Sequence, residues 1–311
     1  MQIIRYKESL HDIWNAFVED SRNGTFLLKR EYMDYHADRF TDCSFLFMEG
    51  TTYIAVLPGN LNGTTYHSHQ GLTYGGLILA DNTGGVLVIK CFELLLHTLK
   101  TIYGTTNLIY HTIPSIYHRY PCGEDLYALF RNNATLVERK MSSALPGGKA
   151  LPFKTLRKRG VAQAKREGLL VAETEEYAPF WAILTENLVS RHQTTPVHSL
   201  EEILLLHKRF PKEIRLVGVF KDSVLIGGCV VYLCKEVAHI QYIATNGMGR
   251  NSGALDLLFD TIIHSFYVDY PFIDFGVSVE DGGTVLNEGL LFQKEGFGGR
   301  AVNYDTYEIK L

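Results

Sequence analysis

The sequence predicts an α+β protein of two tandem units, each a mixed, mainly antiparallel sheet flanked by helices. The chain has 311 residues, about twice the length of an average domain. Hydrophobic residues make up 46% and charged residues 21%, which is typical of a globular protein and too apolar for a disordered chain. A meander of strands, a helix and a further strand occur in both halves, offset by about 165 to 172 residues. Two copies of one unit therefore explain the pattern best.

In the first half, apolar spacing and turn residues predict helices, extended segments and a buried strand. The predicted helices are 10–20, 29–39, 84–103 and 124–131, and the extended segments are 44–48, 52–58, 71–80 and 107–111. Residues 49–51 separate the first two extended segments by a short turn, which indicates a hairpin.

The second half repeats this pattern after a segment rich in Pro and Gly, residues 142–152, which predicts a linker. The boundary is expected there, with an acceptor-recognising lobe 1–148 and a donor-binding lobe 149–311. The predicted helices are 154–167, 177–191, 199–209 and 252–267, and the strands are 214–220, 224–233, 238–245 and 272–276. The helix at 199–209 begins with Ser-x-x-Glu, the form of a capping box.

Charge and cysteine usage narrow the class of protein. Lys+Arg 30 against Asp+Glu 34 gives a net charge of −4, which excludes a generally basic nucleic-acid coat, and no DNA partner is expected. The five cysteines include no CxxC pair, so neither a disulfide framework nor a zinc site is indicated. No stretch is long and apolar enough to span a membrane, and the start of the chain does not resemble a secretory signal. We expect a cytoplasmic protein.

A glycine-rich turn, residues 246–253, follows the predicted strand 238–245 and precedes a helix. Such a turn directs backbone N–H groups at one place, and the helix dipole adds positive charge there. This predicts a site for donor phosphates. Its residues are Gly247, Gly249, Arg250, Asn251, Ser252 and Gly253. A plain tight turn with an exposed arginine is the alternative, and neither a Walker loop nor a dinucleotide fingerprint is present.

Tandem units with such a loop resemble the GNAT N-acyltransferase superfamily, and more narrowly the FemABX group with its paired GNAT-like lobes. The GNAT loop usually ends in Gly-x-Gly/Ala. Here Gly253 stands at the first of these three positions, and Leu255 stands at the last, where a Gly or Ala is usual. Two further segments resemble the FemABX group. They are the basic stretch 153–169, FKTLRKRGVAQAKREGL, and the closing stretch 274–299, in which DFGVS precedes LLFQKEGFGG.

The resemblance implies transfer of an acyl group from acyl-CoA, foremost acetyl-CoA, to an amine of a cell-envelope or polysaccharide precursor, an amino sugar or a peptide. It implies that Lys294 lies beside the reacting carbonyl. It also implies that Arg157 and Lys158, which helical spacing places on one side with Lys154, bind the phosphates of a nucleotide-linked acceptor. Two alternatives stay open: an aminoacyl-tRNA donor, which makes tRNA a partner, and a non-catalytic ligand-binding module.

Aminolysis also needs a group that takes the proton of the attacking amine. His239 is the predicted base, because an imidazole titrates near neutral pH. Period-two alternation places His239 and Gln241 on one strand face and Tyr242 on the other. Asp274 and Ser278, at the end of the next strand, are predicted to orient the substrate or to protonate the leaving group. A structural role for a strand histidine is the alternative.

The first half contains a cluster of polar aromatic residues and glycines between residues 66 and 76. His67 and His69 lack a third ligand with recognisable spacing, so no metal is expected. The composition favours a pocket between the lobes that binds the acceptor. The predicted acceptor residues are His36, Arg39, His67, His69, Tyr74 and His198. A tyrosine-rich, satisfied interior is the alternative.

Overall fold

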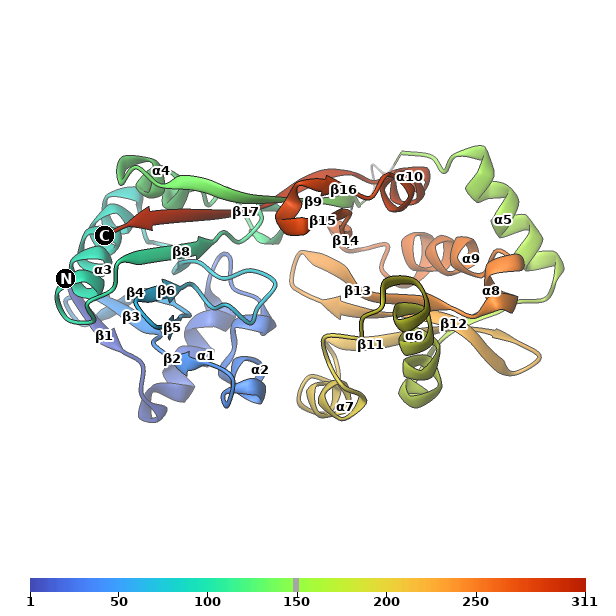
Figure 1. The fold of residues 1–311 in the computed structure, drawn as a ribbon, viewed down its shortest axis with the longest axis horizontal. Helices are drawn as coiled ribbons and strands as arrows, with labels where there is room; N and C mark the ends of the chain where they lie inside the picture. The colour runs from blue at the N-terminus through green and yellow to red at the C-terminus, as the bar shows by residue number, and fades with distance from the viewer. Residues whose placement is uncertain (148–150) are drawn as a thin grey trace. The chain divides into compact units, whose positions relative to one another are not determined.

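The computed structural model describes residues 1–147 and 151–311 (Figure 1). The contacts divide the chain into two compact units. Unit 1 comprises Met1–Met141, Asp281–Thr284 and Asn303–Leu311, and unit 2 comprises Ser142–Glu280 and Val285–Val302. Both units are α+β, which confirms the predicted fold class. They differ from the expected lobes 1–148 and 149–311, because the last strand of the chain passes from unit 2 into unit 1.

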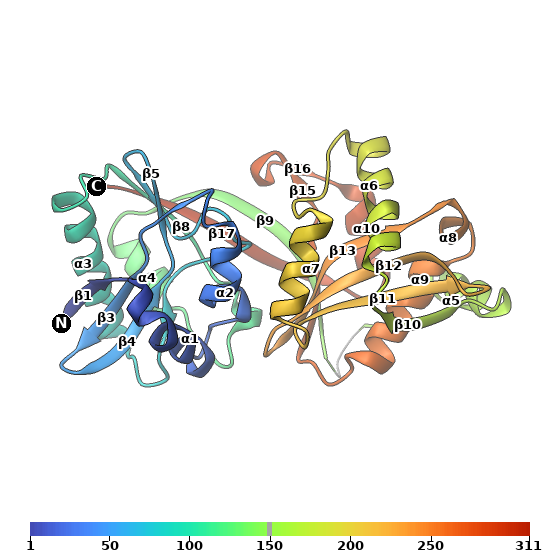
Figure 2. The same cartoon turned by 90° about the horizontal axis from the view of Figure 1, so that it is seen from below.

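Unit 1 contains a four-stranded antiparallel sheet in the order β1-β3-β4-β7 and a second ladder in the order β17-β8-β6-β5-β2. Its strands are β1 (Gln2–Arg5), β2 (Thr41–Asp42), β3 (Phe45–Glu49), β4 (Thr52–Leu57), β5 (Asn60–Asn62), β6 (Thr65–His67), β7 (Ile78–Leu79), β8 (Asn107–His111) and part of β17 (Arg300–Lys310). Its helices are α1 (His11–Asp20), α2 (Arg30–Met33), α3 (Gly85–Thr101) and α4 (Glu124–Arg131). In Figure 2 strands β1, β3 and β4 lie side by side, and α3 packs against β1.

Two predictions in unit 1 were too long. The extended segment expected at 71–80 contains only β7, because the chain before it folds closely on itself. A Cβ at Gly75 would stand 1.7 Å from the carbonyl oxygen of Ser68, and Gly76 has a φ of +89°. In place of the helix expected at 29–39, the structure has α2, which ends at Met33, and then a 3-10 turn that ends at His36.

The predicted linker 142–152 is wrong at its start, because residues 142–146 belong to strand β9 (Thr135–Pro146). Ser142 pairs with Val277 and Leu145 with Ile273 on the neighbouring strand, which gives this segment the ladder that a linker lacks. Proline is tolerated because it is the last residue of the strand. Residues 148–150 lie outside the described residues.

Unit 2 contains one sheet ladder in the order β10-β11-β12-β13-β14-β9, in which only the β13–β14 pair is parallel. Its strands are β10 (Leu170–Thr174), β11 (Ile214–Lys221), β12 (Val224–Leu233), β13 (Val237–Thr245) and β14 (Phe272–Val277), with a small hairpin of β15 (Val279–Glu280) and β16 (Val285–Leu286). Its helices are α5 (Thr155–Arg166), α6 (Tyr177–His192), α7 (Leu200–Arg209), α8 (Gly247–Asn251), α9 (Ala254–Thr261) and α10 (Glu288–Gly296). The predicted capping box of α7 is confirmed.

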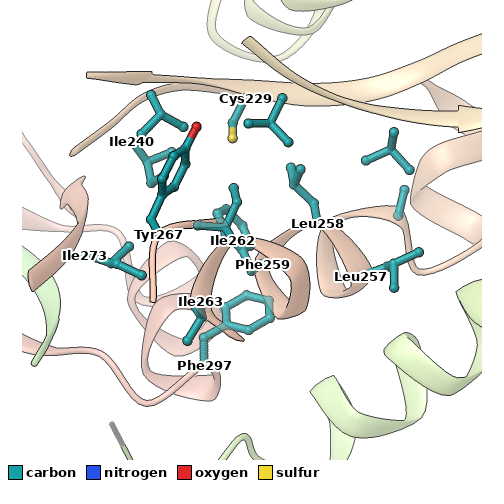
Figure 3. Close-up of a cluster of buried hydrophobic side chains, with 14 of the residues drawn as sticks. Cys229, Ile240, Leu257, Leu258, Phe259, Ile262, Ile263, Tyr267, Ile273 and Phe297 are labelled. Atoms are coloured by element: carbon teal, nitrogen blue, oxygen red, sulfur yellow. The ribbon is translucent and has the colours of Figure 1, made fainter. Parts of the chain in front are cut away.

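The core of unit 2 lies between α9 and the sheet. Figure 3 shows Leu258 and Ile262 of the α9 segment directed toward Cys229 of β12. Phe297, which is fully buried, stacks on Phe275 with ring centroids 5.9 Å apart. Burial of apolar side chains of this size stabilises a fold by about 1.5 to 3 kcal/mol each. Helices α6 and α7 contact the sheet as well, α6 at β12 and β13 and α7 at β11.

The helix predicted at 252–267 is present over residues 254–266, as α9 and the turn that follows it. A separate short helix, α8, precedes Gly253, whose left-handed φ of +74° lets the chain start α9 in a new direction. A π-helical turn, Ile262–Phe266, ends the segment. The glycine therefore has a conformational role that the composition of the loop alone does not specify.

The structure bears on two expectations from composition, one about the cysteines and one about a membrane span. All five cysteines are buried, and burial raises the pKa of Cys91 and Cys122 to about 12, so both are thiols at neutral pH. Over residues 1–147 and 151–311, no helix combines the length and the apolar content needed to cross a bilayer.

Helix α5 approaches the start of α9 through two glycines. A Cβ at Gly160 would lie 1.8 Å from the Asp256 carboxylate, and a Cβ at Gly253 would lie 2.4 Å from the carbonyl oxygen of Gly160. Asp256 in turn pairs with Arg157 of α5 at 2.8 Å. The contact requires glycine on both sides.

We predict that Gly160→Ala destabilises the protein by about 1 to 3 kcal/mol, because the new methyl group displaces Asp256 from Arg157. The matched control is Gly85→Ala in the first turn of α3, where the nearest atom to a Cβ is at 3.7 Å. The control should leave stability unchanged or raise it by up to about 1 kcal/mol. Urea unfolding of the three proteins measures both effects, and equal midpoints would contradict the prediction.

Candidate functional site

Strands β13 and β14 diverge, and this divergence positions the candidate site. The two strands pair only from Val237 opposite Phe272 to His239 opposite Asp274. A bulge lies just beyond this last pair, because Ile240 faces Val231 and Tyr242 faces Val230, which leaves Gln241 without a cross-strand partner. Bulges of this kind bend a strand and increase its twist.

The bulge corrects one expectation from alternation. Tyr242 lies on the same sheet face as His239, because their partners Val230 and Tyr232 are two residues apart on β12. Period two fails here since one residue is inserted into the strand.

A cavity of about 550 Å³ lies in unit 2 where the strands have separated. Its walls come from the end of β13, from Phe275 of β14, and from helices α5, α6, α8, α9 and α10. The polar and charged lining residues are Arg157, Asn187, Thr245, Arg250, Asp256, Gln293 and Lys294. The volume falls within the range of about 300 to 1,000 Å³ that is usual for small-molecule sites.

The glycine-rich loop forms part of this cavity. Gly249, Arg250 and Gly253 line it, whereas Gly247, Asn251 and Ser252 do not. The N-cap Asn246 accepts a hydrogen bond from the N–H of Gly249 at 2.9 Å, and the Ser252 hydroxyl donates to the carbonyl oxygen of Met248 at 2.9 Å.

Two of the loop glycines are explained by packing within the protein. A Cβ at Gly249 would lie 2.7 Å from the carbonyl oxygen of Ile226 on β12, and Gly253 contacts α5 as described above. Gly247 has the most open surroundings, with the Arg250 guanidinium at 3.8 Å from the Cβ position. A role for the loop in binding donor phosphates stays a prediction.

The guanidinium of Arg250 is held in place by two elements. Its Nη1 donates to the Asn187 side-chain oxygen at 2.9 Å and to the Thr245 carbonyl oxygen at 3.0 Å. Asn187 of α6 also donates to Thr245 at 2.8 Å. The positive charge is therefore fixed at the rim where α6, β13 and α8 meet.

The basic helix α5 places its charged residues in different environments. Arg157 lines the cavity, pairs with Asp256 at 2.8 Å and lies over the Phe297 ring at 5.5 Å. Lys154 and Lys158 are exposed. Burial raises the pKa of Asp256, and the nearby Arg157 opposes that rise. Of these three cations only Arg157 is among the residues that line the cavity, and phosphate binding by Arg157 and Lys158 stays a prediction.

Lys294 is buried and lines the cavity. It lies in the last turn of α10, whose N-cap Asn287 accepts a hydrogen bond from the N–H of Leu290 at 3.0 Å. Its ammonium donates to the carbonyl oxygens of Gly276 at 2.7 Å and Val277 at 2.6 Å. Burial lowers the pKa of Lys294 to about 8, and the Asp274 carboxylate opposes this shift. An ammonium has three donors, so one more is present beyond these two bonds.

His239 and Asp274 form a hydrogen-bonded pair at the last rung between β13 and β14. The His239 Nδ1 lies 2.9 Å from one Asp274 carboxylate oxygen, and the Ser142 hydroxyl donates to the other at 2.5 Å. Asp274 is fully buried and His239 is 8% exposed, and neither belongs to the cavity lining. Ser278 is fully buried, and its hydroxyl has no hydrogen-bond partner among the described residues.

The sequence identified His239 and Asp274 separately and missed Ser142. The parallel register that joins the first two was not predicted. Ser142 lay in the segment expected to be a linker. If residues 142–146 had been predicted as a strand that pairs with β14, the Ser142 hydroxyl would have been placed beside β14.

The residues expected to bind the acceptor belong to both units. In unit 1 the rings of His36 and His69 are 5.6 Å apart, and His67 stacks on His111 at 6.5 Å. Arg39 is exposed. Burial lowers the pKa of His69 to about 3, so it is neutral at physiological pH, and it also lowers the pKa of His67.

Two further acceptor candidates lie in other surroundings. Tyr74 is buried and donates to the Thr25 hydroxyl at 2.9 Å. His198 of unit 2 is buried, and its Nδ1 lies 2.6 Å from the Tyr242 hydroxyl. Acceptor binding by these residues stays a prediction. In the part of the chain that the structure describes, no group of three or more His, Cys, Asp or Glu side chains is arranged to hold a metal ion.

A scan against family models and a search of curated proteins find no match. Among solved structures, FemX matches with a TM-score of 0.72 at 10% identity, over 100% of this chain and 98% of that chain. L-PGS from Bacillus licheniformis matches with a TM-score of 0.62 at 10% identity, over 97% and 92%. A conserved protein of unknown function from Bacteroides thetaiotaomicron matches with a TM-score of 0.61 at 11% identity, over 100% and 99%.

These likenesses concern the fold, because the identities are low. The chain has the fold of FemX over its whole length, in agreement with the resemblance to the FemABX group.

We predict that the Lys294 ammonium titrates with a midpoint near pH 8, compared with 10.5 for an ordinary lysine, because burial disfavours its charge. Asp274→Asn should lower the midpoint further, since the variant removes the negative charge that supports the ammonium. NMR titration of ¹⁵N-lysine side chains measures both values, and the Lys294 signal is the one lost in Lys294→Met. A midpoint of 10 or above, or no change in Asp274→Asn, would contradict the prediction.

Proposed function

We propose that unit 2 is the catalytic unit of an N-acyltransferase, in which the cavity holds an acyl-CoA, foremost acetyl-CoA, and an amine attacks the acyl carbonyl. The observation that carries this proposal is the buried Lys294 ammonium on the cavity wall. A charged group in a desolvated wall is costly, and such positions are enriched in functional sites. The GNAT/FemX-like fold supports the same class of reaction.

Lys294 is proposed to stabilise the oxyanion that develops on the acyl carbonyl. Two of its N–H groups are bound to the carbonyl oxygens of Gly276 and Val277, which fixes the nitrogen in place. The remaining N–H is then available to the substrate. A fixed donor in a site of low dielectric stabilises developing negative charge more than the same group in water does.

His239 is proposed to take the proton of the attacking amine. Asp274 lies against its Nδ1, which fixes the orientation of the imidazole ring. The new C–N bond forms while the C–S bond breaks, the amine proton goes to the imidazole, and the thiolate leaves as free CoA. The hydroxyl of Ser278 is proposed to orient the substrate or to protonate this leaving group.

The donor phosphates are proposed to bind at the loop 247–253 and the start of α9. Arg250 supplies a positive charge at this end of the cavity, and the first turn of a helix attracts anions. The proposed acceptor is an amine of a cell-envelope or polysaccharide precursor, an amino sugar or a peptide. Acceptor binding is proposed for Arg157, Lys158 and His198 in unit 2, and separately for His36, Arg39, His67, His69 and Tyr74 in unit 1.

A second candidate is transfer from an aminoacyl-tRNA. Exposed cations on α5, among them Lys158 and Arg159, favour it, since they offer a basic surface to a nucleic-acid phosphate backbone. Such binding would weaken steeply with added salt. A third candidate, a non-catalytic binding module, is favoured by Leu255, which lines the cavity where the GNAT loop usually carries a small residue.

Calorimetric titration with acetyl-CoA, together with release of CoA thiol in the presence of amine acceptors, tests the proposal. We predict saturable binding and a fall in kcat of about 10²- to 10³-fold in Lys294→Met, because the variant removes the oxyanion donor. The affinity for acetyl-CoA should change little, which also shows that the variant is folded.

The matched control is Lys208→Met, which changes an exposed lysine of α7. It should retain full activity. If acetyl-CoA fails to bind while an aminoacyl-tRNA binds, the second candidate replaces the first. If neither binds, the non-catalytic module is the better description.

A further inference from the structure

The cations of the cavity wall are already bound to protein groups. Arg157 pairs with Asp256, Arg250 donates to α6 and to the end of β13, and Lys294 donates to two backbone carbonyl oxygens. A ligand that reaches between them therefore meets few unsatisfied polar side chains. What the wall offers for new contacts is mainly apolar.

The apolar part of the wall comes from three directions. Leu184 and Leu188 belong to α6, Ile243 to β13, and Leu290 and Phe292 to α10. Phe292 is 55% exposed, an unusual position for a phenylalanine. An acetyl group has a single methyl and cannot cover a surface made by three elements.

The charges of the wall discriminate between kinds of acyl group. Among the lining residues that the structure describes, Arg157, Arg250 and Lys294 are cations, while Asp256 is the carboxylate and is paired with Arg157. An acyl group with an ammonium would enter a site of positive charge without an unpaired carboxylate to bind it. Burial of such a charge is costly unless it is paired.

We propose that the cavity selects an uncharged acyl group with an extended apolar chain, carried by an anionic thioester. This inference rests on the proposed acyl-CoA function and adds the class of acyl group. The chain lies against Leu188, Ile243 and Leu290, and the phosphates of the carrier remain at the cationic rim. Acetyl-CoA then still binds and reacts through the carrier part of the site, but more weakly than a thioester with a longer chain.

A chain-length series tests the inference. Acetyl-, butyryl-, hexanoyl- and octanoyl-CoA are titrated into the full-length protein by calorimetry. The affinity should rise by about two- to fourfold for each methylene until the chain fills the apolar part of the cavity. 8-Aminooctanoyl-CoA, which matches the length of octanoyl-CoA but ends in an ammonium, should bind at least about tenfold more weakly than octanoyl-CoA.

A pair of variants on α6 locates the effect. Leu188→Trp places a larger ring in the cavity and should remove the gain from chain length while acetyl-CoA binding is retained. Val189→Trp, at the next residue of the same helix, changes a side chain that is 52% exposed and outside the lining, so it should leave the series unchanged. The wild-type series decides the question even if Leu188→Trp fails to fold.

The outcomes separate this inference from the function on which it rests. Equal affinity for acetyl- and octanoyl-CoA, with acyl transfer observed, overturns the inference and leaves the proposed function standing. Equal affinity for octanoyl- and 8-aminooctanoyl-CoA also overturns it. If no thioester binds and none is consumed, the proposed function fails and the inference fails with it.

Discussion

The carboxylate of Asp274 joins the strands on which the candidate site depends. It accepts hydrogen bonds from Ser142 of β9 and from the backbone N–H of Gly276, and it pairs with His239 of β13. A fully buried carboxylate is tolerated only when such partners replace water. Beyond this rung β13 bulges and β14 turns at Gly276, so the sheet opens. The position of the cavity follows from where this bonded network ends.

The opposite side of the cavity depends on close approach between helices. Gly160 and Gly253 let α5 and α9 meet at backbone distance, and the Arg157–Asp256 pair spans the same contact. The pair places both a cation and an anion at the start of α9. The local charge at this helix start is therefore balanced, and the positive character of the rim comes from Arg250 and the helix dipole.

The sequence predicted the α+β class, the tandem units and most elements of unit 2, because apolar periodicity and turn residues are local signals. It predicted Lys294 through a resemblance. It did not predict the bulge at Gln241, the pairing of His239 with Asp274, or Ser142 as a strand residue. These features depend on register between strands far apart in the chain, which periodicity within one segment does not contain. The composition of the loop also does not show that Gly253 contacts a helix nearly a hundred residues earlier in the chain.

The electrostatic state of Lys294 results from two opposed effects. Burial disfavours the ammonium, while the Asp274 carboxylate and two backbone carbonyl oxygens favour it, and the balance leaves its pKa at about 8. The proton is therefore held at neutral pH, but less firmly than on an exposed lysine. A more exposed ammonium would be screened by water and would stabilise an oxyanion less. An ammonium with no carbonyl partners would lose its charge on burial. The closing segment of the chain thus holds a cation in an apolar wall, and the backbone at the end of β14 makes that cation tolerable.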